Sequence, residues 1–114
     1  MPNILLAGTP QEVAAMRSIL ADGHEISDVN IMAKALEILS KTEFDLIMIG
    51  VHFDESRMFD LIKNIPKFPK NAHAPLICFC TKDSPRAREI RESVYFASKI
   101  LGAWMYLDQS EYKD

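Results

Sequence analysis

The chain has 114 residues, 48% of them hydrophobic and 25% charged, so it can form one domain, residues 1–114, with its own core. A net charge of −3 gives no basic surface of the kind that binds nucleic acid or an anionic membrane. The start of the chain lacks the features of a signal peptide, and no segment has the roughly 18 apolar residues of a membrane span. We therefore expect a cytoplasmic protein.

The first elements are a short apolar run and an amphipathic segment. Ile4–Ala7 is continuously apolar, which is typical of a strand buried on both faces. Pro10 lies at the start of the predicted helix that follows, and Thr9 with Glu12 forms the pattern of a capping box. The apolar positions of this helix recur at helical spacing and are Val13, Met16, Ile19 and Leu20.

The middle of the chain repeats this alternation of strand and helix. His24–Val29 suits a short edge strand, and a helix is predicted over Ile31–Lys41. Leu46–Ile49 is a second buried strand, and Ser56–Ile65 has helical spacing. The proline-rich segment Pro66–Pro75 is predicted to be a loop.

The last third contains two more predicted strands around a long helix. Leu76–Cys80 is apolar throughout, and the helix runs from Ser84 to Leu101. Trp104–Leu107 is the fifth strand, and the polar residues Asp108–Asp114 are too few for a packed helix. The alternation predicts a parallel sheet with helices on both faces and chemistry at the carboxyl ends of its strands.

Four segments that together span nearly the whole chain carry a family resemblance, and they are Ile4–Thr9, Asp45–Gly50, Pro75–Cys80 and Gly102–Leu107. They resemble the response-regulator receiver (CheY-like) family of two-component signalling. The resemblance implies a flavodoxin-like, doubly wound sheet of five strands in the order 2-1-3-4-5. The family normally ends in a further helix, which we predict to be missing here.

The resemblance also places the family's phosphorylation site on residues that cannot perform its chemistry. The metal-binding acidic pair, the phosphoacceptor aspartate, the signalling Ser/Thr and the lysine fall in turn on Gly8 and Thr9, Gly50, Cys80 and Gln109. Mg²⁺ prefers oxygen ligands, and phosphoryl transfer to the protein needs a carboxylate nucleophile. We therefore predict a degenerate pseudo-receiver that is not an enzyme and has no cofactor and no metal.

We predict that such a domain acts through protein–protein interaction in bacterial signal transduction. Without the last helix, one face of the sheet would be uncovered, so its partner would be another signalling protein or a second copy in a homodimer. Nucleic acid and membrane are not expected partners. Core packing or plain solvation competes with a switch or interface role for the candidate residues Tyr95, Trp104, Tyr106, Arg88 and Arg91.

Two alternatives to this interpretation stay open. A small-ligand sensor could bind an anion or nucleotide at Gly8, Thr9 and Gly50, where missing side chains leave room. A redox or metal module could use Cys78, Cys80 and His52, although buried, inert thiols beside a loop histidine are the more common arrangement. Asp54 is either a relocated phosphoacceptor or a solvated loop carboxylate.

Overall fold

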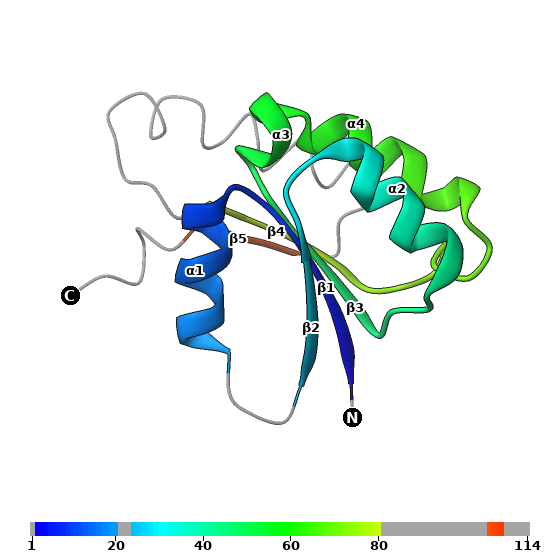
Figure 1. Cartoon of the computed structure of the whole chain (residues 1–114), viewed down its shortest axis with the longest axis horizontal. Helices are drawn as coiled ribbons and strands as arrows, with labels where there is room; N and C mark the ends of the chain where they lie inside the picture. The colour runs from blue at the N-terminus through cyan, green and yellow to red at the C-terminus, as the bar shows by residue number, and fades with distance from the viewer. Residues whose placement is uncertain (1, 21–23, 81–104, 109–114) are drawn as a thin grey trace.

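The protein is a parallel sheet with helices on both faces (Figure 1). This computed structural model describes residues 2–20, 24–80 and 105–108. The strands lie in the order β2-β1-β3-β4-β5, and all four pairings are parallel. Their bounds are β1 Asn3–Ala7, β2 Glu25–Val29, β3 Leu46–Gly50, β4 Leu76–Cys80 and β5 Met105–Asp108. The predicted flavodoxin-like fold class is confirmed.

The described helices divide between the two faces of the sheet. Figure 1 shows α1 (Pro10–Ile19) on one side and α2 (Met32–Lys41) with α4 (Met58–Asn64) on the other. A short turn, α3 (Phe53–Ser56), and a 3₁₀ turn, η1 (Ile65–Lys67), flank α4. The predicted helix over residues 84–101 and the predicted absence of a last helix lie outside the described residues.

The core consists of two apolar clusters separated by the sheet. The larger one joins β1, β3 and β4 to α2 and α4, and includes Leu5, Ile47 and Leu61. The smaller one lies between the sheet and α1, and includes Leu6 of β1 and Met16 of α1. The central strands are apolar at consecutive positions because both of their faces are buried, whereas the edge strand β2 is mostly accessible.

The segment after β3 differs from the sequence prediction. A helix was expected over Ser56–Ile65, but regular helix covers only Met58–Asn64, and η1 takes up the first part of the predicted loop. Before α4, residues 54, 55 and 56 have φ of 41°, 56° and 66°, which is left-handed backbone in three consecutive non-glycine residues. L-residues adopt this conformation at a cost of roughly 1–2 kcal/mol each, so surrounding contacts must hold the turn.

Replacing Ser56 with glycine tests this left-handed turn. Glycine tolerates positive φ, and Ser56 is exposed, so S56G should relieve strain and raise the melting temperature by roughly 2–4 °C after its entropic cost. The matched control is S40G, an exposed serine inside α2, where glycine should lower the melting temperature. Thermal unfolding followed by circular dichroism checks both variants. Equal losses in the two would contradict the left-handed conformation.

Candidate functional site

The carboxyl ends of the three central strands bring most of the predicted site residues to one edge of the sheet. Gly8 follows β1, Gly50 ends β3 and Cys80 ends β4. The register places Gly50 opposite Phe79, one residue before Cys80. Gln109 lies outside the described residues, directly after Asp108, the partner of Cys80 in β5. The fold therefore gathers Gly8, Gly50 and Cys80 at the edge where the chemistry of such sheets is found.

The feature at this edge that sequence reasoning missed is the side chain of Glu12. Thr9 caps α1 by accepting a hydrogen bond from the Glu12 amide at 3.1 Å, and Glu12 Oε1 accepts one from the Thr9 amide at 2.9 Å. The predicted capping box is thus confirmed. The second carboxylate oxygen, Oε2, accepts a hydrogen bond from the backbone amide of His52 at 3.0 Å. Glu12 therefore joins the start of α1 to the turn after β3.

Glu12 also explains why residue 50 is a glycine. A Cβ atom added at Gly50 would lie 2.5 and 2.6 Å from the two carboxylate oxygens of Glu12, closer than real Cβ atoms approach. At Gly8 a Cβ would lie 3.1 Å from Glu12 Oε1, which is tight but less severe. The Glu12 side chain fills the space beside Gly50 and restricts the space beside Gly8, so it reduces the room that the two glycines alone would leave for a ligand. The small-ligand alternative stays a prediction.

The buried carboxylate is stable here because its polar atoms are satisfied. Glu12 is fully buried, and an unpaired charge in such a place would be very costly. Both oxygens accept backbone N–H groups, and a hydrogen bond within a protein typically contributes about 0.5–1.5 kcal/mol. The carboxylate also lies in the first turn of α1, where the helix dipole favours negative charge.

Asp54 has a structural role that neither sequence interpretation included. Its Oδ2 accepts a hydrogen bond from the Met32 amide, at the start of α2, at 2.8 Å. The same oxygen lies 3.5 Å from the Arg57 guanidinium, and the Asp54 side chain is only 21% exposed. The carboxylate is thus not simply solvated, since it ties the left-handed turn to α2.

The residues proposed for a redox or metal module have different structural environments. Cys78 and Cys80 are both buried in β4, and the backbone of His52 bonds to Glu12. Among the described residues, no group of three His, Cys, Asp or Glu side chains gathers to hold a metal ion. This part of the chain gives that alternative no ligand set.

The candidate switch and interface residues are largely untested by the structure. Tyr106 lies in β5, opposite Cys78 of β4. Tyr95, Trp104, Arg88 and Arg91 fall outside the described residues. Their suggested roles stay predictions.

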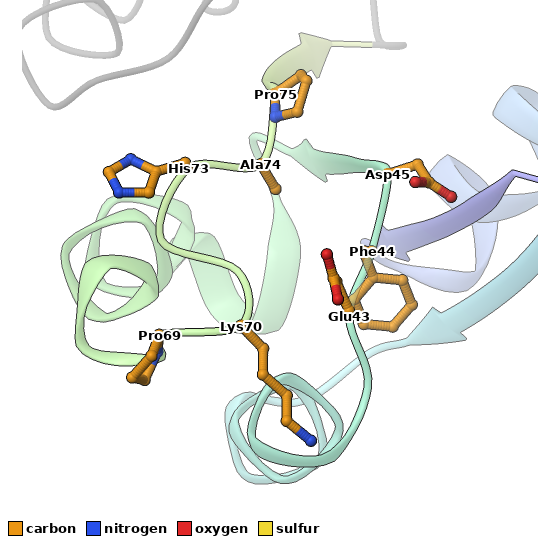
Figure 2. A pocket seen from close by; sticks show the side chains of 8 residues that line it. All are labelled: Glu43, Phe44, Asp45, Pro69, Lys70, His73, Ala74 and Pro75. Atoms are coloured by element: carbon orange, nitrogen blue, oxygen red, sulfur yellow. The ribbon is translucent and has the colours of Figure 1, made fainter.

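The described surface also has hollows, one far from Glu12 and one that reaches Gly8. Figure 2 shows one of about 350 Å³ where the chain enters β3 and β4, at the end of the sheet opposite to Glu12. Its lining includes Glu43, Asp45 and Lys70, whereas the imidazole of His73 points away from the two carboxylates. Buried Asn71 fixes the neighbouring loops by bonding to the backbone of Leu39, Thr42 and Phe44.

The other hollow, of about 410 Å³, lies beside α1 and the end of β2. Its lining includes Gly8, Lys34 and Arg17, and the Arg17 guanidinium is bonded to Asp28 at 2.6 Å. One of the two cations in this lining is therefore already paired with a carboxylate. None of the helices in the described ranges is long and apolar enough to cross a membrane.

Comparison with known proteins relates this geometry to signalling proteins. No family model matches the sequence. The chain is 25% identical over 87 residues to a probable cyclic di-GMP phosphodiesterase of Vibrio cholerae serotype O1. That match covers 76% of this chain but only 20% of the relative, so the chain spans about a fifth of the relative's length.

Solved structures match over nearly the whole chain. A putative response regulator from Chloroflexus aurantiacus superposes with a TM-score of 0.75 at 19% identity, over 96% of this chain and 85% of that one. A response regulator from Hahella chejuensis gives 0.73 at 21% identity, over 99% and 83%. One from Burkholderia pseudomallei, solved with a phosphorylated aspartic acid, gives 0.73 at 16% identity, over 95% of this chain and 59% of that one. The chain has the fold of response-regulator receiver domains.

Proposed function

We propose that this chain is a pseudo-receiver of the response-regulator family. It would act in bacterial signal transduction by binding another protein or a second copy of itself, without accepting a phosphoryl group. The observation that carries this proposal is that the Glu12 carboxylate fills the space beside Gly50, where the receiver resemblance places the phosphoacceptor.

The chemistry of phosphoryl transfer supports the proposal that this chain accepts no phosphoryl group. A receiver-type reaction needs an accessible carboxylate nucleophile and oxygen ligands for Mg²⁺. Residue 50 has no side chain, and both oxygens of the buried Glu12 carboxylate already accept backbone amides. Asp54, the nearest acidic residue after β3 in sequence, is bonded to the start of α2. The described part of the site thus offers neither an accessible carboxylate nucleophile at residue 50 nor free Glu12 oxygens to bind Mg²⁺.

The distribution of apolar side chains supports the proposal that this chain binds another protein or a second copy of itself. On the α1 side of the sheet, Leu20, Leu46 and Ile77 are only partly buried against the smaller core cluster. Ile19, at the end of α1, is 56% exposed. Partly exposed apolar side chains on one side of a sheet suit contact with a partner. The surface that we propose combines this side with β5 and the segment that precedes it.

The phosphodiesterase relative is consistent with a signalling role but does not extend to catalysis in this chain. The match covers only a fifth of that protein. In the described residues, no set of three His, Cys, Asp or Glu side chains is placed for metal-assisted hydrolysis. We therefore propose a non-enzymatic module and expect it to act in the cytoplasm.

Exposure to a small phosphodonor tests the absence of phosphoryl chemistry. The chain incubated with acetyl phosphate and Mg²⁺ should keep its unmodified mass, because no reactive carboxylate is available at residue 50. A functional receiver domain treated in parallel is the positive control. Intact mass spectrometry reads the outcome. A stoichiometric phosphoryl adduct would contradict the proposal, and peptide mapping would show whether Asp54 carries it.

Light scattering tests association through the α1 side. We expect the wild-type chain to dimerise at micromolar concentration and the variant I19D to be monomeric, because a charge at Ile19 would be desolvated in the interface. The matched control is I31D, since Ile31 is 40% exposed at the start of α2 and should leave the dimer intact. A wild-type monomer throughout this range would contradict self-association, and equal effects of both variants would contradict the chosen surface.

A further inference from the structure

We propose that Glu12 is a tethered ligand: its carboxylate permanently occupies the anion position at the carboxyl end of the sheet and locks the turn after β3. This inference rests on the proposed pseudo-receiver function and adds a mechanism by which the site is kept in one state. The site would be closed to external oxyanions by the chain's own carboxylate, not merely deprived of its reactive residues.

The first step is the geometry of the carboxylate. Its two oxygens accept the amides of Thr9 and His52, which lie 43 residues apart, the difference between 52 and 9. These two backbone N–H groups therefore bind one carboxylate, which lies beside Gly8 and Gly50. Converging amides at the start of a helix favour an anion, and Glu12 supplies it from within α1.

The second step is a continuous set of contacts from Glu12 to α2. His52 begins the turn whose residues 54–56 have positive φ. Two residues after His52, at the first left-handed position, Asp54 accepts the Met32 amide of α2 at 2.8 Å. Glu12 and Asp54 thus hold the first half of the turn, and the turn connects α1 to α2.

The third step is the strain in that turn. Three consecutive left-handed residues, none of them glycine, persist only where the surroundings determine the conformation. The bond at His52 and the bond at Asp54 are the described side-chain contacts that do so from neighbouring helices. Loss of the Glu12 bond should therefore change the conformation of residues 54–56 as well as that of His52.

The fourth step is competition. A ligand that is part of the chain has a high effective concentration, so an external anion would have to displace it at a severe disadvantage. Because Glu12 is fully buried and both of its oxygens are bonded, wild-type protein should not respond to phosphate or to small carboxylates. Removal of the Glu12 carboxylate should restore that response.

Chemical rescue of E12A with formate tests the tethered ligand. E12A should lose roughly 10 °C in melting temperature, since it leaves two partly buried amides without their acceptor and opens a cavity at a fully buried side chain. Sodium formate should recover part of this loss saturably, relative to sodium chloride of equal ionic strength, and inorganic phosphate is a second probe. The matched control is E37A, which removes an exposed glutamate paired with Lys41 and should show neither loss nor rescue.

Nuclear magnetic resonance gives the readout that a purely structural role would not produce. Formate should move the amide resonances of Thr9, His52 and residues 54–56 in E12A back toward their wild-type positions. Wild-type resonances should not move with formate or phosphate. Folded E12A whose Thr9 and His52 amides ignore formate would overturn the inference, and so would saturable binding of phosphate at those amides in wild-type protein.

A second variant keeps the test decisive if E12A does not fold. E12Q retains the volume of Glu12 but offers one acceptor oxygen, so at least one of the Thr9 and His52 amides should exchange faster with solvent. Unchanged exchange and unchanged resonances over residues 52–56 would overturn the lock. A phosphoryl adduct on wild-type protein would instead contradict the proposed function while leaving these amide measurements, and the lock, unaffected.

Discussion

One buried carboxylate determines much of what this end of the sheet can do. If the Glu12 side chain left the core, two backbone amides would lose their acceptor, and a side chain at residue 50 would collide with the Glu12 carboxylate. Burial of a charge is tolerated only with good hydrogen bonds, and the Thr9 and His52 amides provide them. One steric constraint therefore links the two positions: the Glu12 side chain occupies the space that a side chain at residue 50 would need.

This constraint changes the meaning of the lost receiver residues. Glycine at positions 8 and 50 would suggest an emptied site if the strands were considered alone. With Glu12 in place the site is filled, the turn after β3 is held in a left-handed conformation, and Asp54 is engaged with α2. The chain thus has the receiver fold with this edge occupied by its own side chain, and this arrangement is the basis of the proposal that the domain acts through its surface.

The fold was predictable because its signals are local. Apolar runs in β1, β3 and β4 gave the buried strands, and the Thr9–Glu12 spacing gave the start of α1. The contact between Glu12 and Gly50 was not predictable, because it joins segments 38 residues apart (50 minus 12) and a capping box already explained Glu12. The left-handed turn was missed for a similar reason, since residues 54–56 contain no glycine to indicate positive φ.

A double-mutant cycle between Glu12 and Gly50 tests the central claim most directly. In the wild-type background, G50A should lower the free energy of unfolding by about 2–3 kcal/mol, because the added methyl group collides with the carboxylate. In the E12A background the same substitution should cost less than about 1 kcal/mol, because the space is then vacant. Chemical denaturation of the four proteins gives the coupling energy. Equal losses in both backgrounds would contradict the claim that Glu12 occupies the acceptor site.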